Sequence, residues 1–167
     1  MSEPLYSFPP LVAPRARVLI LGTMPGKESL RKQQYYGHPQ NSFWRILFDL
    51  FGESFSIDYE QRCELIRKYH LALWDVLQSC HRDGSLDAAI RTEIPNDIPN
   101  LLKQQLYIKT IVFNGRPAAR YYEHFFGQTG NPAYRILPST SPAYAAMDYS
   151  AKLSAWSIIR QLVIDPI

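Results

Sequence analysis

The sequence predicts an α/β fold, a three-layer α/β/α sandwich built on a four-stranded parallel sheet. Four short apolar runs are continuous rather than alternating, which is typical of strands covered on both faces. Helical patterns lie between these runs, and strands that alternate with helices indicate a parallel sheet. The chain has 167 residues, of which 46% are hydrophobic. This length and composition fit one domain with a substantial core, residues 1–167.

The predicted strands are residues 17–22, 70–76, 108–113 and 134–137. The predicted helices are residues 42–51, 59–69, 99–105, 116–126 and 148–163. Gly52 and Asp58 supply a C-cap for the first helix and an N-cap for the second. The stretch 83–99 is rich in loop-forming residues and predicts at most one helical turn.

Composition excludes several classes of protein. The net charge of +3 is compatible with a DNA-binding face but does not demand one. The chain has 2 cysteines and 4 histidines without metal-ligand spacing, so we expect no metal, cluster or other cofactor. No apolar run approaches the roughly 18 residues of a membrane span, and no signal peptide is recognisable. We expect an intracellular monomer, cytoplasmic if the source is prokaryotic.

Ligands of open α/β sheets bind outside the carboxyl ends of the strands, which directs attention to the residues that follow each predicted strand. The first of these segments reads GTMPGKES, residues 22–29. A phosphate-binding P-loop has four residues between its glycines, and its lysine is followed by Ser or Thr. Here three residues separate Gly22 from Gly26, and Glu28 follows Lys27. A nucleoside-triphosphate site is therefore disfavoured.

Two further segments have unusual compositions. The first, YYGHPQNSFWRIL at residues 35–47, places two tyrosines and a turn before Asn41 and an amphipathic helix. Asn41 can cap this helix and can also orient a water in a cleft. The second, LPSTSPAYA at residues 137–145, holds three hydroxyl residues between prolines, which suits contacts with phosphates. It also fits an ordinary Ser-Pro turn.

Together these segments resemble the uracil-DNA glycosylase superfamily. GTMPG, YYGHPQNSFW, LWDVLQSC and LPSTSPAYA occur in the order expected of its hypoxanthine-DNA (deoxyinosine) glycosylase branch. The segment 37–45 is also similar to the mismatch-specific and thymine-DNA glycosylases. The resemblance covers nearly the whole chain and implies a single DNA glycosylase domain that acts in base excision repair by flipping a deaminated base into a pocket.

The chain departs from the mismatch-specific branch at two positions. Met24 stands where that branch has a water-positioning Asn, and Leu137 stands where relatives have a base-contacting His or Asn. The hypoxanthine branch shares the first change, and resemblance to it assigns water positioning to Asn41. Hypoxanthine is therefore the expected base, and uracil excision by the usual route is in doubt.

The resemblance also suggests the remaining roles. Tyr36 would stack on the flipped base, and Asp75 lies where relatives place a base-reading side chain, although an ion-pair or capping role is equally open. An ionised Asp75 would accept from the N–H of hypoxanthine or uracil, which adenine lacks. The expected base pocket comprises Gly22, Thr23, Met24, Pro25, Gly26, Tyr36, His38, Asp75 and Asn114. The expected DNA contacts are Ser139, Thr140, Ser141, Pro142 and Tyr144.

Other assignments stay open. A turn histidine such as His38 is more often structural than catalytic. No lysine of these motifs is an obvious Schiff-base nucleophile, so we expect no lyase activity. The alternatives are a uracil or mismatch-specific glycosylase, a non-catalytic DNA-lesion-binding module and, more remotely, a free-nucleoside hydrolase.

Overall fold

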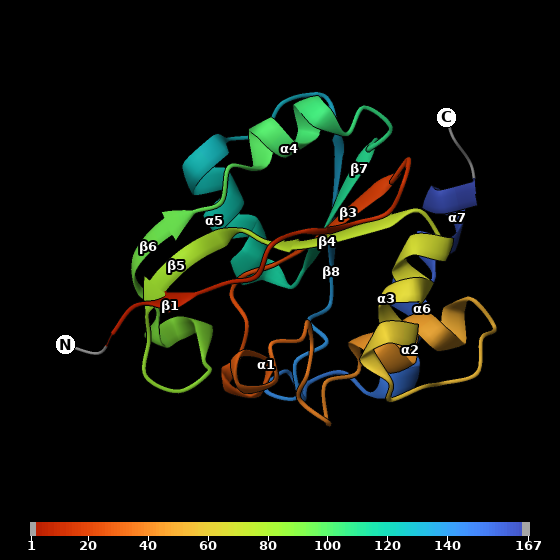
Figure 1. The fold of residues 1–167 in the computed structure, drawn as a ribbon, viewed down its shortest axis with the longest axis horizontal. Helices are drawn as coiled ribbons and strands as arrows, with labels where there is room; N and C mark the ends of the chain where they lie inside the picture. The colour runs from red at the N-terminus through yellow and green to blue at the C-terminus, as the bar shows by residue number, and fades with distance from the viewer. Residues whose placement is uncertain (1–2, 165–167) are drawn as a thin grey trace.

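The computed structural model describes residues 3–164, in which helices cover both faces of a five-stranded sheet (Figure 1). In spatial order its strands are β2 (Leu11–Val12), β4 (Leu71–Asp75), β3 (Val18–Gly22), β7 (Thr110–Asn114) and β8 (Ala133–Leu137). The four predicted strands run parallel, as expected. The fifth, β2, was not predicted and pairs antiparallel with β4 at the edge.

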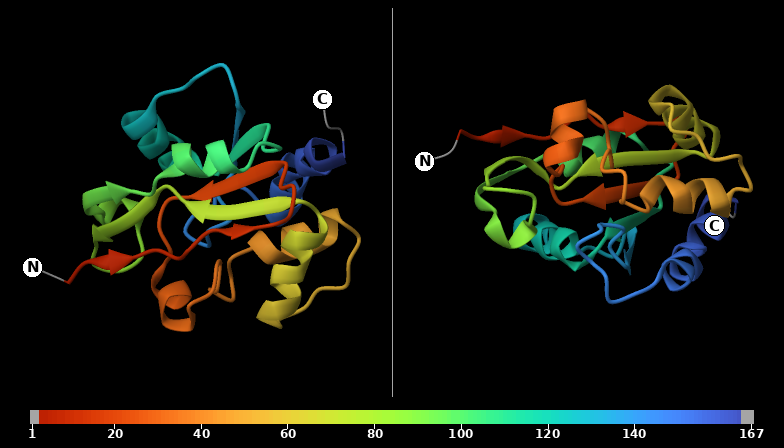
Figure 2. Two further views of the ribbon diagram at one scale, coloured as in Figure 1. Left: turned by 45° about the horizontal axis from the view of Figure 1, so that its top comes forward. Right: turned by 90° about the horizontal axis from the view of Figure 1, so that it is seen from below.

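Two groups of helices make the outer layers, one on each face of the sheet (Figure 2). The first group is α2 (Phe43–Leu50), α3 (Tyr59–Lys68), α6 (Tyr149–Trp156) and α7 (Ile158–Ile164). The second is α4 (Ile98–Gln104) and α5 (Arg116–Phe126). This confirms the predicted three-layer α/β fold.

Strand β3 shows why continuous apolar runs form the centre of the sheet. All five of its residues are buried. Successive side chains of a strand point to opposite faces. Val18 and Ile20 accordingly pack against the first helix group, and Leu19 and Leu21 pack against the second.

A second, smaller sheet was not predicted. Its strands are β1 (Leu5–Tyr6), β5 (Leu77–His81) and β6 (Arg91–Pro95), all antiparallel, with β5 in the middle. Because β5 begins two residues after β4 ends, this sheet extends the chain past the carboxyl edge of the main sheet. It holds the loop 82–90, which contains the short 3-10 helix η1 (Asp87–Ala89), beside the end of β4.

The final helix was predicted as one element over 148–163, and this was wrong. The structure has two helices, α6 and α7, which separate at Ser157. The Ser157 hydroxyl donates to the Ser154 carbonyl at 2.6 Å, a side-chain bond that competes with the helical backbone pattern. The apolar stripe concealed this break, because Trp156 and Ile159 stay in the core on either side of it.

Candidate functional site

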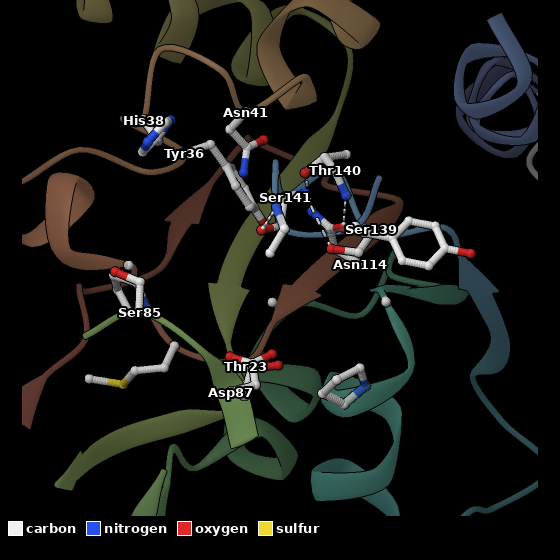
Figure 3. Close-up of a pocket in the computed structure, with 18 of the residues that line it drawn as sticks. Thr23, Tyr36, His38, Asn41, Ser85, Asp87, Asn114, Ser139, Thr140 and Ser141 are labelled. Atoms are coloured by element: carbon white, nitrogen blue, oxygen red, sulfur yellow. Dashed lines mark hydrogen bonds between the residues drawn. The ribbon is translucent and has the colours of Figure 1, made fainter. Parts of the chain in front are cut away.

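A cavity of about 860 Å³ opens at the carboxyl ends of β3, β4, β7 and β8 (Figure 3). Every site residue predicted from the sequence lies on its wall. The loop after β3 and the loop that carries Tyr36 and Asn41 form one part of this wall. The loop 138–147 and the segment 85–87 form another. The predicted residues are therefore brought together in space.

Asn41 lies immediately before α2, half-buried at the cavity. Its side-chain oxygen accepts from the backbone amide of Phe43 at 2.9 Å. Its backbone N–H donates to the backbone carbonyl of His38, also at 2.9 Å. Ser42 is the N-cap residue but makes no side-chain capping bond. The Asn41 side chain thus performs the capping, and its second oxygen lone pair stays available for a water.

Asn114, at the end of β7, holds the loop 138–147 in place by hydrogen bonds. Its side-chain nitrogen donates to the Thr140 hydroxyl and its side-chain oxygen accepts from the Thr140 amide, both at 2.9 Å. The Thr140 carbonyl in turn accepts from the Ser42 amide at 3.1 Å. Asn114 therefore forms part of the pocket wall and joins the loop 138–147 to the start of α2.

Tyr36 is held rigidly on the other side of this network. Its ring stacks on Phe43, with ring centroids 3.9 Å apart. A side-chain hydrogen bond with Asn114 fixes its hydroxyl, while burial raises the pKa of that hydroxyl above its usual value. Its φ of 52° is unusual for a bulky residue, and such strain concentrates at functional sites. An ordered aromatic ring on the cavity wall is suited to stacking on a base.

His38 is exposed at the rim of the cavity. Its Nδ1 accepts from the Gln40 amide at 3.1 Å, so the neutral ring carries its proton on Nε2. This bond closes the turn that leads into Asn41. His38 therefore stabilises this turn and also lies on the rim of the cavity.

The segment 22–26 passes very close to the side chains of the cavity floor. A Cβ on Gly22 would lie 2.6 Å from Asp75 Oδ1 and 3.1 Å from the Tyr36 hydroxyl oxygen. Thr23, Met24 and Pro25 are buried beside it, and Gly26 is the N-cap of α1 (Lys27–Lys32). Glycine at position 22 lets the backbone lie between two polar groups of the site.

We expect Gly22→Ala to destabilise the protein by about 1–3 kcal/mol, because the new methyl group displaces Asp75 and Tyr36. Chemical denaturation of the variant measures this change. Gly130→Ala is the matched control, since a Cβ there meets nothing within 4 Å. Equal stability of the two variants would contradict the close packing at Gly22.

A buried lysine of α6 supports the loop 138–147. Lys152 of α6 donates from Nζ to the Tyr144 carbonyl at 2.8 Å and lies 5.3 Å from the centroid of the Tyr144 ring. Lys152 is 6% exposed, whereas Tyr144 is 40% exposed at the cavity. Burial lowers the pKa of the lysine. Lys152 thus fixes the position of an exposed aromatic residue on the predicted DNA-contacting loop.

We expect Lys152→Met to weaken binding to duplex DNA about three- to tenfold, because the Tyr144 loop loses its buried hydrogen bond. Fluorescence anisotropy at fixed salt measures the affinity. Lys103→Met removes the same charge from an exposed position on α4 and controls for electrostatics. Equal losses in the two variants would rule out a positioning role for Lys152.

Sequence reasoning missed the residues that the loop after β5 brings to the site. The Ser85 hydroxyl accepts from the Lys27 amide at 2.9 Å, Leu86 is 61% exposed at the cavity, and Asp87 lines its floor. Asp87 and Thr23 lie together across the cavity from Asn41 (Figure 3). No strand-end pattern marked Asp87, because its position depends on the unpredicted small sheet.

Asp75 is the most unusual group of the floor. It is 4% exposed, and its Oδ2 is buried without a hydrogen-bond partner among the described residues. Burial, with a smaller effect of the Asp87 carboxylate, raises its pKa to about 7 against the opposing effect of Arg82. An unpartnered buried carboxyl on a cavity wall is a candidate ligand-binding group.

Within residues 3–164, no cluster of three or more His, Cys, Asp or Glu side chains is placed to hold a metal ion. In the same range, no helix has the length and apolarity needed to cross a membrane.

Comparison with known proteins identifies the family. The model of the uracil DNA glycosylase superfamily matches residues 9–160. A hypoxanthine DNA glycosylase of Methanosarcina barkeri is 40% identical over 115 residues, which cover 68% of this chain and 73% of that protein. One of Methanosarcina acetivorans is 37% identical over 137 residues, 81% of this chain and 85% of that protein.

A solved structure is similar in fold as well as in sequence. It is the solution NMR structure of a protein from Methanosarcina acetivorans that is provisionally described as a uracil DNA glycosylase. It superposes with a TM-score of 0.82 at 34% identity and covers 96% of this chain and 99% of its own. The chain therefore belongs to the uracil DNA glycosylase superfamily.

Proposed function

We propose that this protein is a monofunctional DNA glycosylase that removes deaminated bases, with hypoxanthine as the preferred base. The observation that supports this most directly is the cavity itself. It combines a side-chain amide with a free oxygen lone pair (Asn41), a stacked aromatic ring (Tyr36) and a buried carboxyl whose Oδ2 has no partner (Asp75). The relatives named hypoxanthine DNA glycosylase support the choice of base.

The reaction needs placement and electrostatics more than a strong nucleophile. Extruding the nucleotide costs roughly a few kcal/mol, and less at a mispaired deaminated base. As the glycosidic bond breaks, positive charge develops on the sugar and negative charge on the departing base. Asn41 would hold the attacking water through its side-chain oxygen, whose orientation the Phe43 amide fixes.

Hydrolysis without lyase activity is consistent with the exposure of Lys27, the lysine that lines the cavity. Lys27 lies at the rim but is exposed at the start of α1. Schiff-base lysines are activated by desolvation or by a neighbouring cation, and Lys27 is not desolvated. Borohydride treatment of a reacting mixture is therefore expected to trap no covalent protein–DNA complex.

The substrate assignment is tested by single-turnover excision from duplexes that contain inosine, uracil or xanthine at one position. We expect inosine to be processed fastest, and binding to weaken steeply with salt. A clear preference for uracil would move the chain to a uracil or mismatch-specific activity. Tight binding to the lesion without excision would favour the non-catalytic DNA-binding alternative.

A further inference from the structure

Leu86, in the middle of the loop 82–90, is a large apolar side chain that the fold leaves mostly in solvent. It is 61% exposed and lines the cavity. Apolar surface in water carries a free-energy cost that burial against a ligand removes. Single exposed leucines are common on proteins, so the exposure of Leu86 has meaning only through its position. That position is the wall of the proposed active site.

Hydrogen bonds hold the loop around Leu86 against the loop that follows β3. The Ser85 hydroxyl accepts from the backbone amide of Lys27 at 2.9 Å. Arg82 is buried and donates from Nη2 to the Pro25 carbonyl at 2.7 Å. The loop therefore presents Leu86 in a defined position, so that little ordering is needed when a ligand contacts it.

The loop 138–147 borders the cavity from another side. Ser85, the neighbour of Leu86, lies across the cavity from Ser139 (Figure 3). The exposed ring of Tyr144 belongs to the same loop as Ser139 and also lines the cavity. Two loops from distant parts of the chain thus each place an exposed apolar side chain at the cavity.

The charges on the cavity wall indicate which kind of ligand would cover Leu86. Lys27 and Arg116 are both exposed and line the cavity, and neither forms a salt bridge in the described part of the chain. Glu28, which follows Lys27, is already paired with Arg31. An apolar side chain on a wall with unpaired cations suits a ligand that has flat apolar faces and an anionic backbone. A nucleic-acid strand has both properties.

We propose that Leu86 enters the DNA duplex beside the extruded nucleotide and occupies part of the space that the base has left in the stack. This inference rests on the proposed function, because extrusion of a base is what creates such a space. Apolar side chains inserted between base steps are a general means of holding a duplex open. Leu86 and Tyr144 would then support the opened duplex from two sides of the cavity.

The competing assignment is a contact between Leu86 and the extruded base itself, since Leu86 lines the same cavity. An abasic nucleotide separates the two assignments. A duplex that contains one tetrahydrofuran residue has a gap in its stack but no base that could enter the pocket. A side chain that fills the gap contributes to the binding of this duplex, whereas a side chain that contacts only the extruded base does not.

The test is the affinity for the tetrahydrofuran duplex and for the same duplex without a lesion, measured by fluorescence anisotropy at fixed salt. Leu86→Ala is expected to weaken binding to the abasic duplex about tenfold, because most of the apolar contact is lost. Its affinity for the intact duplex, which has no gap, should not change. Leu86→Met keeps the apolar volume and should bind the abasic duplex nearly as the wild type does. Single-turnover excision of hypoxanthine from a duplex should also slow about tenfold in Leu86→Ala.

Leu106→Ala is the matched control, since Leu106 is 72% exposed and does not line the cavity. It is expected to match the wild type in every measurement. If Leu86→Ala slows excision but binds the abasic duplex normally, Leu86 contacts the extruded base and the inference is overturned. Equal weakening on the abasic and intact duplexes, or no effect on either, overturns it as well. Failure of the wild type to excise hypoxanthine, uracil or xanthine overturns the proposed function, while the abasic duplex still decides the role of Leu86.

Discussion

Asn41→Ala is expected to lower the single-turnover rate of hypoxanthine excision by about 10²–10³-fold, the usual cost of removing one preorganised catalytic group. The side-chain oxygen of Asn41 is fixed by the Phe43 amide, so its free lone pair has one direction in which to hold a water. Alanine removes this acceptor. Quenched-flow or manual time courses with excess enzyme measure the rate free of product release.

Asn41→Asp separates the two ends of the amide. A carboxylate can still accept from the Phe43 amide and from a water, so this variant should retain much more activity than alanine. If both substitutions reduce excision equally, the side-chain nitrogen rather than the oxygen is the essential group. If Asn41→Ala cleaves as fast as wild type, the catalytic assignment is wrong.

A structural control is needed because Asn41 also caps α2, and loss of a cap costs about 1 kcal/mol. Asp58→Ala provides it. Asp58 caps α3 by accepting from the Glu60 amide at 3.0 Å and does not line the cavity. A similar loss of stability with unchanged excision is expected for this variant. It would show that a lost cap alone does not abolish excision.

The sequence predicted the elements that have a strong local hydrophobic pattern and missed those that do not. Residues 18–22 form a central strand because five successive apolar side chains need cover on both faces. Strands of two residues such as Leu11–Val12 carry no periodicity and form only because β4 offers an edge. The break at Ser157 depends on one hydroxyl and leaves the apolar stripe intact.

The residues of the site divide in the same way into those that the sequence located and those whose contacts it could not predict. Tyr36 and Asn41 stand in a recognisable motif before α2, and the 138–144 loop stands in another after β8, so the sequence located them. The hydrogen bonds between Asn114 and Thr140 and the electrostatic effect of Asp87 on Asp75 join residues 26 and 12 positions apart. Such contacts depend on the packing of whole loops, and single-sequence patterns do not encode their geometry.

The largest stability effect is expected at Asp75. Its pKa is raised from 3.8 to about 7 in the folded protein, so the folded state binds a proton that the unfolded chain has lost between these values. The free energy of unfolding therefore falls as pH rises from about 4 to about 7 and changes no further above that. The difference corresponds to at most about 4 kcal/mol.

Asp75→Asn removes this titration and is expected to become more stable relative to wild type as pH rises. Near pH 4 both side chains are neutral and the two proteins should have similar stability. Near pH 8 the variant should be more stable by about 2–4 kcal/mol, because the wild type then buries a charge that Arg82 offsets only in part. Urea denaturation at several pH values measures the difference, in which other titrating groups cancel. Asp83→Asn supplies the exposed control. A difference that is independent of pH would show that Asp75 is satisfied as a carboxylate in the folded protein.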